Sequence, residues 1–153
     1  MKHFVNIFKY SLFLSLVVAM ASCGGDDDGG EEEDTTLSDQ AELLVQGTAT
    51  VSSAKLDGNN GDIDWDGFTV TFSGNQDGGS YTTTATGDQL LVWPASGNWE
   101  FGNDTGTIVS RSDGTDMSMS VGKNALELTF DVSTSGSGRV LVVDGEWIFK
   151  FNF

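Results

Sequence analysis

Few residues in this chain of 153 could do nucleophilic or metal chemistry. The single histidine is His3 and the single cysteine is Cys23, so the sequence after Cys23 contains neither type. That stretch therefore lacks the groups for Ser-His-Asp or Cys-His catalysis and for zinc sites built on histidine or cysteine. Carboxylate chemistry and calcium binding stay open, because both need only oxygen atoms.

Calcium binding has one candidate segment, in which Asp62, Asp64 and Asp66 alternate with apolar residues and Gly67 follows. Alternate carboxylates and a glycine are how an EF-hand calcium loop begins. The pattern then fails, because Ser73 stands at the twelfth position of the loop, where a bidentate glutamate belongs. A polar turn between strands explains the segment better, and weak calcium binding by the three aspartates is the alternative.

Acidic and aromatic side chains could also act on sugars or bind them. Glycoside hydrolysis needs two carboxylates, and Glu100 and Glu127 could supply them, but no spacing marks them as a pair. We therefore expect that the protein is not an enzyme. The best candidates for contact with a ligand or glycan are Trp65 in a polar turn, Tyr81, and Trp93 beside a proline. The other interpretation of these three rings is packing at the rim of a core.

The segment before Cys23 has the layout of a secretory signal. Lys2 and Lys9 make its start basic, residues 10–21 form an apolar run, and small residues precede Cys23. The run is too short for a membrane-spanning helix, which takes about 20 apolar residues. The arrangement resembles a bacterial lipoprotein signal, in which the cysteine is lipidated on sulfur and becomes the new N-terminus. The resemblance implies a signal peptide over residues 1–22 and a lipid anchor on Cys23.

An acidic stretch follows the cysteine, with seven acidic residues and no basic one in residues 26–34. Like charges repel, so we expect residues 23–37 to form a disordered linker. Acidic residues just after the lipidated cysteine resemble the export signal of surface lipoproteins in one large Gram-negative phylum. This resemblance implies a protein that is anchored in the outer membrane by its lipid and faces outward.

The remaining sequence is also acidic, and the formal net charge of the whole chain is −16. Nucleic acids and anionic membranes are poor partners for a surface of that sign. We expect no nucleic-acid partner.

From residue 47 onward, short runs of alternating apolar and polar residues are separated by Gly, Asp, Asn and Ser. Alternation with a period of two predicts half-buried strands joined by turns. We expect about eight strands and a kink at Gly145 within the last, with a tight hairpin there as the alternative. The expected strands cover residues 48–56, 68–73, 80–85, 98–101, 106–111, 116–121, 125–132 and 139–153.

One short helix is expected before the first strand. Ser38 is the predicted N-cap, and Asp39 and Glu42 would lie in the first turn, where the helix dipole favours negative charge. The helix would end by Gly47. It would place a small apolar face, with Ala41, against the strands.

The short connections indicate an all-β, antiparallel up-and-down meander, which can close into a barrel or stack as a β-sandwich. A helix at residues 40–44, Gly47 opening the first strand, the segment 93–101 and the closing segment 145–149 together resemble the small lipocalin-like domains of surface lipoproteins. The resemblance covers residues 38–153. Ala49 stands where the lipocalin pattern has a tryptophan.

The resemblance implies an eight-stranded barrel that holds a small apolar or amphipathic ligand in its mouth. A barrel of this size can also be filled by its own side chains. The other function left open is a glycan- or protein-binding accessory or adhesion module. An apolar internal cavity would favour ligand binding, whereas exposed Trp65 and Tyr81 over a filled interior would favour the accessory module.

Overall fold

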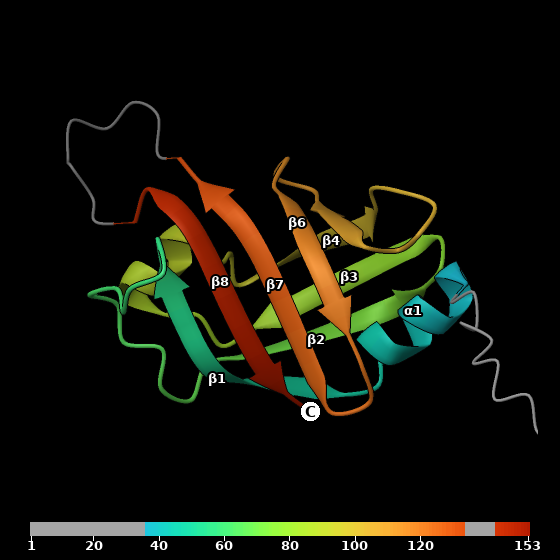
Figure 1. The fold of residues 1–153 in the computed structure, drawn as a ribbon, viewed down its shortest axis with the longest axis horizontal. Helices are drawn as coiled ribbons and strands as arrows, with labels where there is room; N and C mark the ends of the chain where they lie inside the picture. Colours follow the sequence, from blue (N-terminus) through green and yellow to red (C-terminus); the bar gives the residue numbers. More distant parts are fainter. Residues whose placement is uncertain (1–35, 134–142) are drawn as a thin grey trace, which may run out of the picture. The chain divides into compact units, whose positions relative to one another are not determined.

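The chain forms a closed antiparallel barrel of eight strands, in which each strand pairs with its neighbours in the sequence (Figure 1). The computed structural model describes residues 36–133 and 143–153. Its elements are α1 (Leu37–Leu44), β1 (Thr48–Leu56), β2 (Thr69–Asn75), β3 (Gly78–Thr83), the 3₁₀ helix η1 (Gly87–Leu91), β4 (Ser96–Phe101), β5 (Ile108–Arg111), β6 (Asp116–Val121), β7 (Ala125–Val132) and β8 (Gly145–Asn152).

Closure of the barrel depends on the pairing of its first and last strands. Val51 of β1 lies opposite Phe151 of β8, and Leu56 lies opposite Trp147, with a bulge between Val51 and Ser53. Because β8 also pairs with β7 along its whole length, no strand of the sheet keeps a free edge. The all-β meander expected from the sequence is therefore confirmed as a barrel, and the β-sandwich alternative is excluded.

Alternate side chains of each strand point into the barrel, as the sequence pattern predicts. In β8 the buried residues are Trp147, Phe149 and Phe151, and Lys150 between them faces outward. Each of the eight strands contributes at least one residue to a single buried hydrophobic cluster, and Ala49 is the buried residue that β1 contributes. The inward stripes predicted from period-two alternation are thus the core of the barrel.

The helix α1 begins earlier than we expected, because its N-cap is Thr36 and the prediction of Ser38 was wrong. The Asp39 N–H donates to Thr36 Oγ1, and the Thr36 N–H and hydroxyl donate to Asp39 Oδ2 at 2.9 and 2.7 Å. These bonds hold the pKa of Asp39 below its usual value. Glu42 consequently lies beyond the first turn.

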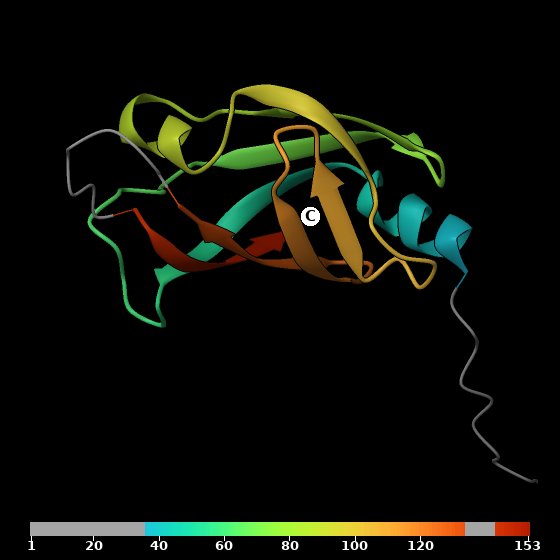
Figure 2. The same ribbon diagram turned by 90° about the horizontal axis from the view of Figure 1, so that it is seen from above.

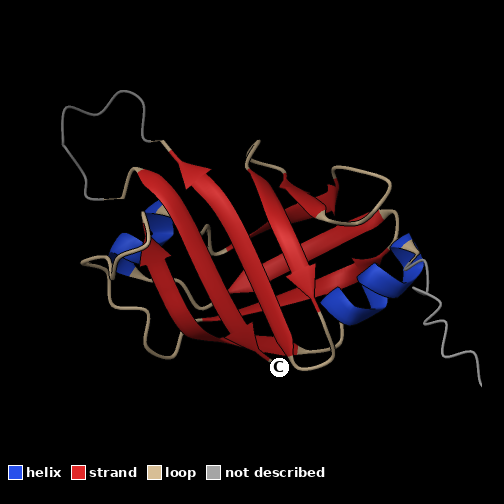
Figure 3. Cartoon of the chain, in the orientation of Figure 1, coloured by secondary structure: helices blue, strands red, loops and turns tan. Residues whose placement is uncertain are grey.

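The helices α1 and η1 lie at opposite ends of the barrel (Figures 2 and 3). The helix end carries α1, whose Leu44 is fully buried, and Gln46 Nε2 ties the segment after α1 to the Gly122 carbonyl at 2.9 Å. The loop end carries the connections β1–β2, β3–β4 with η1, and β5–β6. We use these two names below.

The observed strand bounds agree with the expected ones to within a few residues, except at β8. That strand begins at Gly145, so Val143 and Asp144, which we had placed within one long kinked strand, precede it. Residues 139–142 of the expected strand lie outside the described residues. The glycine has φ +137°, a conformation in which an added Cβ would lie 2.8 Å from the Asp57 carboxylate.

Candidate functional site

Aromatic side chains from two loops and two strands gather at the loop end of the barrel. Trp65 of the β1–β2 connection packs edge-on against Phe149, with ring centroids 4.7 Å apart, and against Phe68 at 5.0 Å. Trp93, which follows η1, lies 5.8 Å from Phe149 and 5.9 Å from Phe68. Phe130 of β7 stacks on Phe149 at 5.7 Å. The two loop tryptophans therefore share the same pair of phenylalanines.

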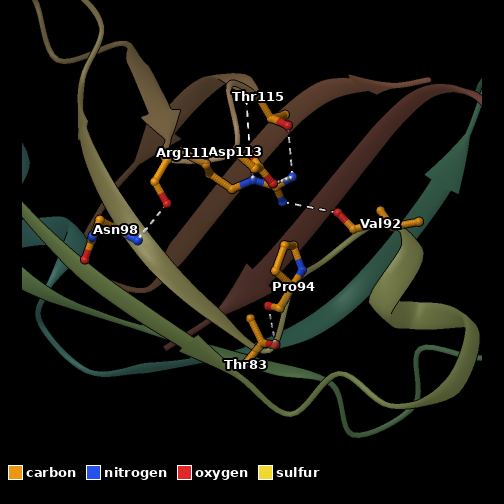
Figure 4. A network of polar contacts seen from close by, with 8 residues as sticks. Thr83, Val92, Pro94, Asn98, Arg111, Asp113 and Thr115 are labelled. Carbon is orange, nitrogen blue, oxygen red and sulfur yellow. Dashed lines mark hydrogen bonds and ion pairs between the residues drawn. The ribbon is translucent and has the colours of Figure 1, made fainter. Parts of the chain in front are cut away.

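Hydrogen bonds between loops hold the two tryptophans in place. The side chain of Gln89 in η1 donates to the Asp64 carbonyl at 2.6 Å, which ties η1 to the β1–β2 connection. The main-chain N–H of Trp93 donates to the main-chain carbonyl of Gln89 at 2.8 Å. Thr83 Oγ1 donates to the Pro94 carbonyl at 3.0 Å (Figure 4). Gln89 thus positions both loops that carry the aromatic rings.

Arg111, at the end of β5, is buried under this cluster with 5% of its surface exposed. Its Nη2 lies 2.8 Å from Asp113 Oδ2, and its Nη1 donates to the Val92 carbonyl at 3.1 Å (Figure 4). The guanidinium carbon lies 5.1 Å from the Trp93 ring and 5.3 Å from the Phe130 ring, in cation–π contact with both. The cation therefore connects the β5–β6 turn, the η1 segment and the core.

The carboxylate of Asp113 compensates the charge of Arg111. Partial burial acts to raise the pKa of Asp113, but the Arg111 charge and hydrogen bonds from Thr115 and Arg111 outweigh it and lower that pKa below its usual value of 3.8. Thr115 Oγ1 also accepts a hydrogen bond from Arg111 at 3.0 Å. The pair is thus ionised at neutral pH.

The four tryptophans differ in what their indole N–H groups contact. Trp99 Nε1 donates to the Ser73 carbonyl at 3.2 Å, and Trp147 Nε1 donates to the Val143 carbonyl at 2.9 Å. Trp65 Nε1 and Trp93 Nε1 are buried and have no hydrogen-bond partner among the described residues. A buried donor left without an acceptor costs about 1–3 kcal/mol, so two such groups in one cluster point to an acceptor outside the described residues.

The three aromatic residues singled out in the sequence are all buried. Trp65 is 7% exposed, Tyr81 2% and Trp93 0%. Both Trp65 and Tyr81 pack into the core, as in the packing interpretation, and neither presents an exposed ring to a glycan. Burial raises the pKa of Tyr81, and the Arg111 charge only partly opposes this. Trp65 and Trp93 lie in one cluster, whereas Tyr81 adjoins it through Trp93, at 6.1 Å between ring centroids.

The candidate calcium residues do not form a ligand cluster. Asp64 Oδ1 accepts the Asp66 N–H at 3.0 Å, which is the bond of an Asx turn. Among residues 36–133 and 143–153, no three acidic, cysteine or histidine side chains gather as a metal site, and this includes Asp62 with its two neighbours. The nearby carboxylate of Asp57 accepts the Glu146 N–H at 3.0 Å. The segment is a polar turn that places Trp65.

The two candidate carboxylates of a glycosidase are far apart in the sheet. Glu100 on β4 lies opposite Ser110 of β5, while Glu127 on β7 lies opposite Lys150 of β8 and contacts its Nζ at 2.9 Å. Two strands separate β4 from β7. The fold does not bring Glu100 and Glu127 together.

A shallow groove of about 470 Å³ lies on the outer face of the barrel, across β1, β6, β7 and β8. Polar side chains line it, including Ser52, Ser120, Glu127, Lys150 and Asn152. None of the tryptophans lines it. The groove is therefore separate from the aromatic cluster at the loop end, and more of its lining side chains are polar than those of the cluster.

Sequence reasoning did not single out Arg111 or Gln89. Arg111 is the only charged side chain among the buried residues of the described part of the chain, and its isolation in an otherwise uncharged strand was a signal that could have found it. Thr86 and Gln89 have the spacing of a helix N-terminus, and the Thr86 N–H does donate to Gln89 Oε1 at 2.9 Å. That spacing could have predicted η1.

Comparisons with protein-family models, with curated proteins and with solved structures found no significant match. In the described part of the chain, no helix has the length and apolar character that a membrane span requires. The predicted signal peptide over residues 1–22, Cys23 and most of the linker over 23–37 lie outside the described residues. The barrel itself therefore supplies the structural evidence about function.

Proposed function

We propose that the protein is a non-enzymatic surface lipoprotein whose barrel binds a small apolar or amphipathic ligand at the loop end. The acyl groups on Cys23 would anchor it in the outer membrane, and the acidic stretch after Cys23 would direct it to the outer face. Neither a nucleic acid nor a cofactor is part of this proposal.

The observation that carries the ligand proposal is the pair of buried indole N–H groups without acceptors. Ligand sites in proteins are mostly apolar, with a few polar groups that fix orientation. The loop end has that composition, because the rings around Trp65 and Trp93 are aromatic and the two N–H groups are free to donate. The other two tryptophans offer no such donor, since the Trp99 N–H is bonded to the Ser73 carbonyl and the Trp147 N–H to the Val143 carbonyl.

Two exposed leucines belong to the helix η1 that precedes Trp93. Leu90 and Leu91 of η1 are 46% and 40% exposed, and they are the large hydrophobic residues that the described part of the chain exposes. They immediately precede Val92 and the buried Trp93. An apolar molecule that approaches the loop end would meet these leucines before it reaches the rings.

Ligand binding can be tested by extraction of the purified full chain with organic solvent, followed by mass spectrometry. We expect a small apolar or amphipathic molecule in stoichiometric amount from protein made in its own cells, and uptake of a long-chain ester by the delipidated protein. A matched sample of the Trp65→Phe/Trp93→Phe variant should contain less of this molecule. An empty protein that takes up no apolar probe would contradict the proposal.

Anchoring is tested separately by labelling cells with radioactive palmitate. The parent chain should incorporate label and resist salt extraction from the outer membrane, whereas Cys23→Ser should do neither. Protease added to intact cells should cleave the parent chain if the barrel faces outward. An unlabelled parent chain would refute the lipid anchor without affecting the ligand proposal.

The outer groove favours a second candidate function, a glycan- or protein-binding accessory module. Hydroxyl, amide and charged side chains converge there, as a sugar would require, although no aromatic ring faces it among its lining residues except Phe151, which is buried. Glycan-array binding that is lost in Asn152→Ala and retained in Trp65→Phe/Trp93→Phe would support this function instead of ligand binding at the loop end.

A further inference from the structure

The kind of group that could satisfy Trp65 and Trp93 follows from what surrounds them. A buried water usually makes about three hydrogen bonds. The rings packed on Trp65 belong to Phe68, Trp147 and Phe149, and the only N–H among them, that of Trp147, already donates to the Val143 carbonyl. A water beside Trp65 would gain little beyond one bond from these neighbours. An acceptor oxygen on an apolar molecule suits the surroundings better.

Charge at the loop end decides which acceptor fits. The cation of Arg111 is close to Trp93 but forms a two-atom pair with Asp113, through Nε at 3.3 Å and Nη2 at 2.8 Å. Its charge is thereby largely neutralised. The β1–β2 connection adds further acidic residues, Asp62, Asp64 and Asp66. An anionic ligand would meet a net negative field, so an uncharged acceptor is favoured over a carboxylate.

We propose that Trp65 and Trp93 recognise an uncharged apolar molecule that carries an acceptor oxygen, such as the ester, ketone or alcohol group of an alkyl chain. This inference deepens the proposed function and rests on it. The oxygen accepts an indole N–H, and the alkyl part packs on Phe68 and Phe149, which contact both tryptophans. Entry requires the β1–β2 connection to separate from η1, which breaks the bond from Gln89 to the Asp64 carbonyl.

The test compares three probes of similar length: methyl laurate, which is neutral with acceptor oxygens, laurate, which is anionic, and tridecane, which has no acceptor. Equilibrium dialysis would use the full chain with Cys23→Ser, so that no acyl group attached to the protein competes for the site. The tested variants are Trp65→Phe and Trp93→Phe, which keep an aromatic ring and remove the N–H. Trp99→Phe is the matched control, because its N–H is already bonded to the Ser73 carbonyl.

We expect the Cys23→Ser chain to bind methyl laurate about three- to tenfold more tightly than tridecane, the range that one hydrogen bond supplies. Laurate should bind more weakly than methyl laurate at pH 7.5. The preference for the ester should fall in Trp65→Phe or Trp93→Phe and persist in Trp99→Phe.

Two results would overturn the inference. One is an unchanged preference for methyl laurate in both loop-end variants, since the N–H groups would then not be recognised. The other is tighter binding of laurate, which would refute the charge argument. If none of the three probes binds to the Cys23→Ser chain, the proposed function itself fails, so the two failures are distinguishable. Far-UV circular dichroism of each variant checks that the barrel is retained.

Discussion

The two ends of the barrel are closed by different kinds of contact. At the helix end, α1 is fixed by backbone and capping hydrogen bonds, and Gln46 Nε2 donates to the Gly122 carbonyl. At the loop end, aromatic rings pack around the buried Arg111, and two indole donors have no acceptor among the described residues. Polar contacts within the chain therefore fix the helix end, whereas the loop end keeps two donors without a described partner.

This difference shows how one barrel can separate stability from binding. A polar group that is satisfied within the chain contributes to stability, while a buried donor without an acceptor weakens the fold until a partner arrives. The loop end also consists of connections rather than strands, and connections are where binding residues concentrate. We expect substitutions at the helix end to affect stability alone and those at the loop end to affect stability and binding.

The largest effect is expected from Arg111→Met. The substitution removes the ion pair of Asp113, which is 39% exposed, and leaves the Val92 carbonyl without its Arg111 donor, and such a buried unsatisfied acceptor costs about 1–3 kcal/mol. Urea denaturation followed by tryptophan fluorescence measures the free energy of unfolding. The control is Lys150→Met, since the exposed Lys150–Glu127 pair should contribute less than about 1 kcal/mol. Equal losses in the two variants would contradict the difference between the buried and exposed pairs.

Substitution of tryptophan by phenylalanine should distinguish a bonded indole donor from one without a described acceptor. Trp99→Phe removes a donor that the Ser73 carbonyl uses, so we expect it to lower the free energy of unfolding by about 1 kcal/mol more than Trp65→Phe, which removes a donor without an acceptor. Thermal and urea unfolding of both variants measure the difference. A larger loss in Trp65→Phe would mean that the Trp65 N–H is satisfied in the ligand-free protein.

The ion pair at the loop end makes stability depend on pH in acid. The pKa of Asp113 is lower in the folded protein than its usual value of 3.8. Its contribution is therefore complete above about pH 5 and is lost as the pH falls through the folded-state pKa. We expect Asp113→Asn to be less stable than the parent by about 1 kcal/mol at pH 7, because the carboxylate is 39% exposed. The difference should shrink as the pH falls below 3.8 and through the lowered folded-state pKa of Asp113, and a difference that does not change with pH in acid would contradict this assignment.

The smallest effect is expected at the cap of α1. Thr36→Ala removes the acceptor for the Asp39 N–H and should lower the free energy of unfolding by about 0.5–1 kcal/mol. Thr36→Ser keeps the hydroxyl and is the control. Neither variant should change the affinity for methyl laurate, because α1 and η1 lie at opposite ends of the barrel (Figure 2). A change in affinity would contradict the separation of the two ends.

Much of the fold could be predicted because its signals are local. Alternation such as that of Leu126, Leu128 and Phe130 sets which face of a strand is apolar wherever the strand lies. The N-cap was misplaced because Ser38 and Thr36 are both good capping residues by type. Only Thr36 has an acidic residue three positions later, Asp39, that completes the reciprocal bonds.

The site could be predicted only in part. Trp65 and Trp93 were selected for their residue type and turn context, but whether a tryptophan faces solvent depends on how its loop folds back on the barrel. The bond from Gln89 to the Asp64 carbonyl joins residues that are distant in sequence, and no local pattern indicates it. The calcium hypothesis rested on sequence spacing alone. In the structure the Asp64 carboxylate accepts the main-chain N–H of Asp66 within the same turn.

The sequence by itself determined that this is an antiparallel β protein with alternating strands and, after Cys23, neither histidine nor cysteine. Only the tertiary structure decided that the sheet closes, because closure needs Val51 to pair with Phe151 across nearly the whole domain. It also decided that Arg111 is buried beneath Trp93 and that two of the four indole N–H groups have no acceptor in the described part of the chain. Side-chain alternation follows from each strand's own backbone, whereas hydrogen-bond satisfaction in a core depends on neighbours that only the complete barrel brings together.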